Sequence, residues 1–200
     1  YSVAYKVLET VIFLPAIYIG LVMPVLSRHA FSEREKFIKT FRRTFDIIAI
    51  FAVWFASYIF LMSGWIVKII GGSGFVQSSP VLQILSLAIF LIFFGNLGGN
   101  AIIALNLQKK AMGIYLVGAV FNLGANLLLI PRYSYYATAW TTVLTELAIT
   151  LMMFLLIKKE TRTVPDKTAL VKSLVAISAV ILLALPLRAH FILASIVWLL

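Results

Sequence analysis

The chain has 200 residues, of which 62% are hydrophobic and only 12% are charged, and its formal net charge at pH 7 is +10. A soluble domain of this length needs a polar surface that these residues cannot supply, so the soluble globular classes are excluded. The chain contains no cysteine, which excludes disulfides and thiolate metal sites. A basic soluble protein suggests nucleic acid as a partner, but the distribution of the basic residues gives a better account of the charge, and no nucleic-acid partner is expected.

The apolar residues fall in long runs that contain no charged residue. These runs cover residues 10–27, 47–67, 69–108, 111–131 and 173–187. Each run is near or beyond the roughly 18–20 residues that a helix needs to cross a bilayer. Backbone groups in lipid must pair within the protein, and the runs lack the alternation of barrel strands, so helices are expected.

The sequence therefore predicts an all-α fold, a polytopic transmembrane helix bundle that forms a single transmembrane region over residues 1–200. The predicted helices, about seven, cover roughly residues 1–27, 45–70, 80–107, 110–131, 134–157, 168–187 and 190–200. Glycines at 71–74 break the chain before the third helix, Pro80 suits its first turn, and Pro131 with Ser134 predicts a tight turn. Because the chain starts without methionine and stops inside an apolar run, we expect it to be a fragment of a longer protein.

Lys and Arg gather in alternate connections between the predicted helices. The second, fourth and sixth connections hold one each, Lys68, Arg132 and Arg188. The positive-inside rule then places the other three in the cytoplasm and the chain start outside, which predicts a multi-pass protein of the cytoplasmic (inner) membrane. The basic residues of the first, third and fifth connections are Arg28, Arg34, Lys36, Lys39, Arg42, Arg43, Lys109, Lys110, Lys158, Lys159, Arg162, Lys167 and Lys172.

The first connection has mixed charge, and two interpretations of it stay open. Residues 33–39 suit a short surface helix whose basic face rests on anionic membrane lipid, or a solvated connector. Asp46 follows Arg42 and Arg43, which predicts an ion pair at the cytoplasmic end of the second helix, where that helix begins.

Ionisable side chains inside membrane helices are costly, which makes Lys6, Glu9 and Glu146 candidate functional residues. Lys6 and Glu9 are three apart, so they share a helix face and can pair. Lys6 also suits an interface anchor whose long side chain reaches water. Glu146 lies in mid-helix, with Thr142 and Thr150 at four-residue spacing, which fits either a structural interhelical bond or part of a polar pathway.

Amide side chains form a second polar set. Asn96 and Asn100 are four apart in the third helix, and Asn122 and Asn126 are four apart in the fourth, so each pair shares a face. Two interpretations of these amides stay open: they pack between helices, or they form a polar groove that hydrogen-bonds sugar hydroxyls. Pro15 and Pro24 are predicted to kink the first helix.

Signals of an enzyme are absent from the sequence. His29 and His190 lie in different connections, no metal-ligand spacing occurs, and the glycines at 71–74 lack the Lys and Ser/Thr of a phosphate-binding loop. We therefore expect no catalytic residues, no metal and no cofactor.

Several segments, in order, resemble a known transporter family. They are YSVAYKVLE at 1–9, LP at 14–15, MPVLSR at 23–28, GF at 74–75, VLQILS at 81–86, NLGAN at 122–126, IP at 130–131 and ATAWTTVLTE at 137–146. The chain is similar over nearly its whole length to oligosaccharide flippases of the multidrug/oligosaccharidyl-lipid/polysaccharide exporter superfamily. The resemblance implies the second lobe of a two-lobe exporter, without its opening helix and with part of a further helix pair.

The resemblance also implies a function, which is to move polyprenyl-diphosphate-linked oligosaccharide across the membrane for envelope polysaccharide synthesis. It implies that Lys6 and Glu9 lie in a cavity, because related lipid II flippases carry an arginine and an acidic residue there. Lysine in place of arginine loses bidentate phosphate geometry. Polysaccharide assembly proteins would be further partners. The alternatives are a drug/cation antiporter of the same superfamily, which favours acidic cavity residues, and a membrane-embedded glycan polymerase or acyltransferase.

The predicted topology can be tested by cysteine labelling, because the natural chain has no cysteine. In intact cells, a membrane-impermeant thiol reagent should label Ser73→Cys but not Ser32→Cys or Thr163→Cys. Labelling of Ser73→Cys only after permeabilisation would reverse the orientation.

Overall fold

The computed structural model describes residues 1–162 together with residues 168, 171, 172, 175 and 178. This part is all-helical, with five helices long and apolar enough to cross a membrane rather than the seven predicted for the whole chain. The predicted helices at 168–187 and 190–200 lie outside the described residues, apart from single helical positions. The elements are α1 (Ser2–Ser32), α2 (Arg34–Gly71), the 3₁₀ helix η1 (Ser73–Ser78), α3 (Ser79–Ala104), α4 (Gln108–Tyr133) and α5 (Tyr135–Thr161).

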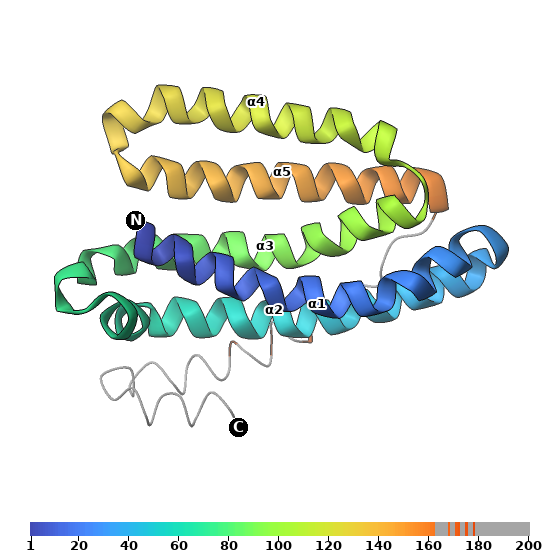
Figure 1. Cartoon of the computed structure of the whole chain (residues 1–200), viewed down its shortest axis with the longest axis horizontal. Coiled ribbons are helices and arrows are strands. Elements are labelled where there is room, and N and C mark those ends of the chain that lie inside the picture. The colour runs from blue at the N-terminus through green and yellow to red at the C-terminus, as the bar shows by residue number, and fades with distance from the viewer. Residues whose placement is uncertain (163–167, 169–170, 173–174, 176–177, 179–200) are drawn as a thin grey trace.

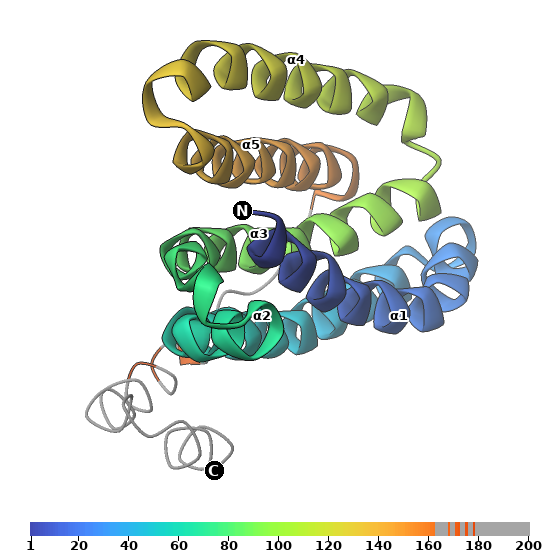
Figure 2. The ribbon, with the colours of Figure 1, turned by 60° about the vertical axis from the view of Figure 1, so that its left-hand side comes forward.

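α3 lies at the centre of the bundle. It packs against α1, α2 and α5, whereas α4 packs on α5 and makes little contact with α3 (Figures 1 and 2). From Ile84 to Phe94 the α3 sequence is apolar apart from Ser86, as expected for a helix covered by neighbours on several sides. Its fully buried side chains include Leu85, Ile89 and Leu97. α4 and α5 therefore form a hairpin attached to a core of α1, α2 and α3.

The first connection differs from the sequence prediction. α1 continues to Ser32, only Glu33 separates it from α2, and α2 begins at Arg34 rather than near residue 45. The connection is rich in Arg, Lys and Glu, which are good helix formers although they do not form an apolar run. The surface helix predicted at 33–39 is the start of α2. A hydrogen bond from Lys36 to Glu33, at 2.5 Å, lowers the pKa of the exposed Glu33 carboxyl.

A row of phenylalanines holds this early part of α2 against the bundle. Phe37, Phe41 and Phe45 follow at four-residue spacing, and all three are buried. The Phe45 ring lies 5.1 Å from that of Phe94 on α3, and both Phe41 and Phe45 lie about 6 Å from Phe154 on α5. Aromatic packing with two other helices therefore extends α2 beyond its apolar run.

The connections alternate between the two ends of the bundle. Figure 1 shows the α1–α2 and α3–α4 connections and the end of α5 at one end, here called the basic end because Lys and Arg cluster there. The Arg34 guanidinium donates a hydrogen bond to the main-chain oxygen of Glu160 at 2.5 Å, and Lys110 forms an ion pair with the Glu160 carboxylate. These contacts link α2, α4 and α5. The opposite, aromatic end carries Tyr1, Tyr5, Tyr133, Tyr135, Tyr136 and Trp140.

α1 passes through both of its prolines as one helix, and it bends along its length (Figure 1). Each proline lacks the N–H that would bond to the carbonyl one turn earlier, which is a usual cause of a bend. Pro15 is buried and Pro24 is exposed. Pro15 and Pro24 thus lie within a bent but continuous helix. Pro131 likewise lies inside α4, which ends at Tyr133 before the turn at Ser134.

Gly118 of α4 lies at a close contact with α5. A Cβ atom at Gly118 would lie 2.5 Å from Ile149 Cδ1 and 2.7 Å from its Cγ1, whereas a Cβ at Gly124 would meet nothing within 4 Å. Small residues at helix contacts allow such close packing in membranes. A larger residue at 118 therefore requires the Ile149 side chain to shift, whereas one at 124 does not.

We expect Gly118→Val to destabilise the protein by about 1–3 kcal/mol, the usual range for overpacking. The measurement is the thermal unfolding midpoint of the full-length protein in detergent. Gly124→Val is the matched control and should leave the midpoint nearly unchanged. Equal loss in both variants would show that helix propensity, and not the contact with Ile149, determines the effect.

Candidate functional site

A polar groove of about 390 Å³ lies among α3, α4 and α5. Its polar side chains are Asn96 and Asn100 from α3, Tyr115 from α4 and Glu146 from α5. The remaining wall consists of glycines and apolar side chains. Polar groups at membrane depth are expensive unless they pair or face water or a ligand, so this groove is the candidate functional site.

Two glycines and two asparagines of α3 line the groove side by side. Asn96 and Asn100 occupy one face of the helix, and Gly95 and Gly99 lie beside them. A Cβ at Gly95 would lie 3.2 Å from Thr150 Oγ1 and 3.8 Å from Glu146 Oε2. At Gly99 it would lie 3.4 Å from the Tyr115 hydroxyl. Glycine at both positions therefore lets polar groups of α4 and α5 approach the α3 backbone.

The two α3 amides keep hydrogen-bonding capacity for an occupant of the groove. Asn96 donates to the carbonyl of Ile92 at 3.1 Å, and Asn100 donates to the carbonyl of Asn96 at 2.9 Å. Each bond uses one of the two N–H groups of an amide and leaves its side-chain oxygen as an acceptor. The groove therefore offers donors and acceptors together.

Glu146 is the one acidic residue of the groove lining, and it is half-buried. Among the described residues the ion pairs are Lys36–Glu33 and Lys110–Glu160, so no cation neutralises Glu146 there. Of the threonines expected beside it, Thr150 approaches Gly95, whereas Thr142 donates to the carbonyl of Thr138 in its own helix. Glu146 is thus a carboxyl group at membrane depth that faces an open groove.

Asn122 and Asn126 have a different role from the α3 amides. Asn122 donates to Thr145 Oγ1 at 3.0 Å, Asn126 donates to Asn122 Oδ1 at 3.0 Å, and Thr141 donates to Asn126 Oδ1 at 3.0 Å. These bonds form a network between α4 and α5. The four amides predicted as one set therefore divide into two that line the groove and two that join helices.

Lys6 and Glu9 lie outside this groove. Both are exposed on α1, and the pairing that their spacing allows is not among the ion pairs of the described residues. The Tyr1 nitrogen lies 3.5 Å from Ser78 Oγ, so α1 and α3 start at a common level and both run toward the basic end. With Lys6 near the start of α1 and Asn96 in the second half of α3, a rise of 1.5 Å per residue separates their levels by roughly 20 Å.

The ion pair predicted for Asp46 is not among those of the described residues. Asp46 is half-buried, while Arg42 and Arg43 are exposed.

Tyr115 lines the groove but was not among the predicted site residues, although it lies on the same α4 face as Gly118 and Asn122 by helical spacing. That small and polar stripe is the sequence signal that could have identified it.

Comparison with known proteins supports the class of the chain. No family model and no solved structure match it. A segment of 78 residues, 39% of the chain, is 32% identical to an uncharacterized membrane protein of Methanocaldococcus jannaschii. The matched segment spans 15% of that protein's length. Fold and comparison together define a membrane protein with several apolar helices.

The division of the amides predicts different stability effects. Asn122→Ala removes a bond between two helices and should destabilise the protein by about 1 kcal/mol, near the range measured for interhelical hydrogen bonds in membranes. Asn96→Ala removes a bond within one helix and should change stability little. Thermal unfolding of the two full-length variants measures this. Equal or reversed effects would contradict the assignment of Asn122 to packing and Asn96 to the groove.

Proposed function

We propose that this chain belongs to a transporter that moves polyprenyl-diphosphate-linked oligosaccharide across the cytoplasmic membrane for envelope polysaccharide synthesis. The observation that carries the proposal is the polar groove among apolar helices. Asn96, Asn100, Tyr115 and Glu146 face it without a full set of internal partners among the described residues. A permanently lipid-filled groove would leave these groups unsatisfied, so a polar substrate or water is the fitting occupant.

The chemistry of the groove suits sugar hydroxyl groups. A hydroxyl both donates and accepts, and the amide and carboxylate oxygens accept while the amide N–H groups and the phenol donate. The apolar remainder, with Ile92 and Ile149, suits the carbon faces of sugar rings. A groove of about 390 Å³ is large enough to hold part of an oligosaccharide, in the size range of small-molecule sites.

Lys6 supplies the second part of the proposal. It is exposed near the aromatic end of α1, and neither ion pair of the described residues involves it. Its ammonium is therefore available to a phosphate, with which a charge-assisted hydrogen bond is strong in a poorly solvated place. The separation of roughly 20 Å between Lys6 and the groove fits one extended substrate that has a diphosphate at one point and sugars at another.

A drug/cation antiporter is the second candidate, and Glu146 is the observation that favours it. A carboxylate at membrane depth without a cationic partner among the described residues can take up a proton or a cationic substrate. In that case the groove would recognise positive charge, and Lys6 would have no part in substrate binding. The two candidates therefore assign the essential charge to different residues.

The test uses the full-length protein in cells that depend on it for polysaccharide export. Lys6→Ala should abolish or sharply reduce export at normal membrane abundance, and Lys6→Arg should retain much of it because the charge is preserved. Lys68→Ala is the matched control, because Lys68 is also an exposed lysine toward the aromatic end and contacts the Trp65 ring. This control should export normally.

Normal export by well-expressed Lys6→Ala would overturn the diphosphate assignment and return Lys6 to an interface anchor. If cation efflux, but not polysaccharide export, depends on the protein and is lost in Glu146→Gln, the antiporter is the correct candidate. The two outcomes are distinguished by measuring both transport activities in both variants.

A further inference from the structure

A second, apolar cleft runs between α1 and α2, separate from the polar groove. It consists of two adjoining hollows of about 370 Å³ and about 230 Å³, and Tyr18 lines both. The larger hollow lies toward the basic end and includes Lys39 and Arg43. The smaller lies deeper and reaches Phe93 of α3. The cleft thus has a charged end and an apolar end.

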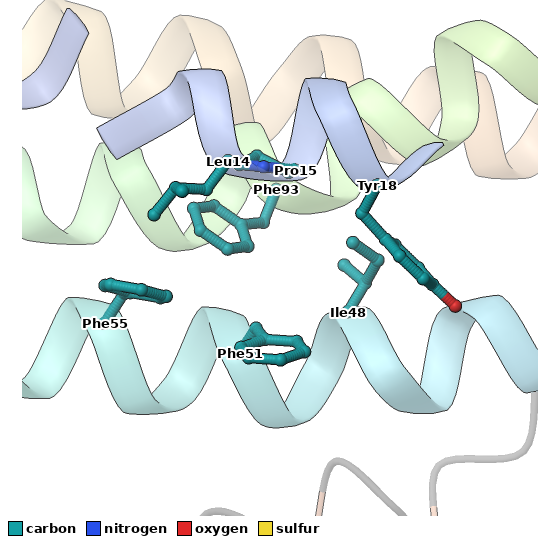
Figure 3. Close-up of a pocket in the computed structure, with 7 residues that line it drawn as sticks. All are labelled: Leu14, Pro15, Tyr18, Ile48, Phe51, Phe55 and Phe93. Atoms are coloured by element: carbon teal, nitrogen blue, oxygen red, sulfur yellow. The ribbon is translucent and has the colours of Figure 1, made fainter. Parts of the chain in front are cut away.

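The deep hollow is lined almost entirely by carbon. Figure 3 shows Leu14 and Pro15 of α1 facing Phe51 and Phe55 of α2, with Phe93 between them. The Tyr18 ring reaches from α1 toward α2, and its hydroxyl points away from Phe55, toward the end of α2 that carries Arg43 (Figure 3). The polar atom of the hollow is therefore directed to its charged end.

The charged end has two cations on one face of α2. Lys39 and Arg43 are four residues apart and both are exposed, and neither belongs to the ion pairs of the described residues. Thr44 lies between the charged end and the apolar hollow, and its hydroxyl donates to the carbonyl of Thr40 at 2.9 Å. Two cations outside the ion pairs of the described residues form a suitable site for a phosphate.

We propose that this cleft binds one molecule of an anionic glycerophospholipid from the surrounding membrane. Its phosphate lies between Lys39 and Arg43, and one acyl chain lies along Leu21 and Tyr18 toward Phe93. Basic pockets between transmembrane helices bind anionic headgroups in this manner. The proposal does not depend on the transported substrate, because the cleft and the polar groove share no lining residue.

The length of the cleft identifies a membrane phospholipid as the occupant. From Arg43 to Phe55, α2 rises roughly 18 Å at 1.5 Å per residue. One leaflet of a bilayer has a hydrocarbon thickness of roughly 15 Å, half of the whole core. An acyl chain of ordinary length therefore fills the cleft when its phosphate lies at the basic end. A free phosphate would leave the apolar part empty.

The charge of the cleft favours an anionic over a zwitterionic headgroup. Lys39 and Arg43 carry two positive charges, and no carboxylate is among the residues that line either hollow. A choline or ethanolamine group would bring a third cation to the same place. An acidic lipid with an uncharged glycerol headgroup has no such repulsion, so phosphatidylglycerol is the suitable probe.

The experiment measures lipid retained by the purified full-length protein in native mass spectrometry. Dioleoyl phosphatidylglycerol should be retained, and dioleoyl phosphatidylcholine should be retained much less. The double variant Lys39→Gln/Arg43→Gln should bind phosphatidylglycerol roughly tenfold to thirtyfold more weakly, at about 1 kcal/mol for each basic residue. The matched control Lys109→Gln/Lys158→Gln removes two exposed charges at the same end, outside the cleft, and should retain the lipid.

Two further probes test the acyl slot without any substitution. Dihexanoyl phosphatidylglycerol has the same headgroup on short chains and should be retained clearly less than the dioleoyl form. Glycerol 3-phosphate should not displace the dioleoyl lipid. Equal loss of binding in both double variants would overturn the proposal by showing general attraction to a basic surface. Equal retention of short and long chains, or displacement by glycerol 3-phosphate, would overturn it by showing a phosphate site alone.

Discussion

The structure depends on one constraint, which is that polar groups at membrane depth must find partners because lipid offers none. Helices provide partners for the backbone groups, so only polar side chains still need partners. Between α4 and α5 these side chains have partners, since Asn122, Asn126 and the facing threonines hydrogen-bond to one another. In the groove, the side-chain oxygens of Asn100 and Glu146 have no partner within the described residues. The same residue types thus serve packing in one place and present a binding surface in another.

α3 contributes side chains to both places on which the proposals rest, the polar groove and the cleft between α1 and α2. Asn96 lines the polar groove, and Phe93 lines the apolar cleft beside α1. One helix therefore contacts both proposed sites. Its own amides bond to carbonyls one turn back, which satisfies part of each amide without a neighbouring helix. This leaves α3 free of polar bonds that would fix it to α4, in agreement with the small contact between those two helices.

The helices themselves followed from composition and from apolar runs, and α3, α4 and α5 begin and end within a few residues of prediction. The start of α2 did not, because the buried Phe37 and Phe41 are held by packing, with Phe41 against Phe154 of α5, and such contacts are invisible in a local pattern. Spacing correctly placed each pair of amides on one face. It could not tell which face meets a threonine and which meets a groove, since that depends on the neighbouring helix. The place of Tyr115 in the groove depends on the neighbouring helix in the same way.

The α4–α5 hairpin has a consequence for how the protein enters the membrane. Its two helices are joined by the single turn residue Ser134, and the amides of α4 bond within α4 and to α5. A hairpin of this kind can leave the insertion machinery as a pair, with its amides already shielded from acyl chains. Biogenesis of the groove would then be a late event, completed when a preassembled hairpin docks on α3.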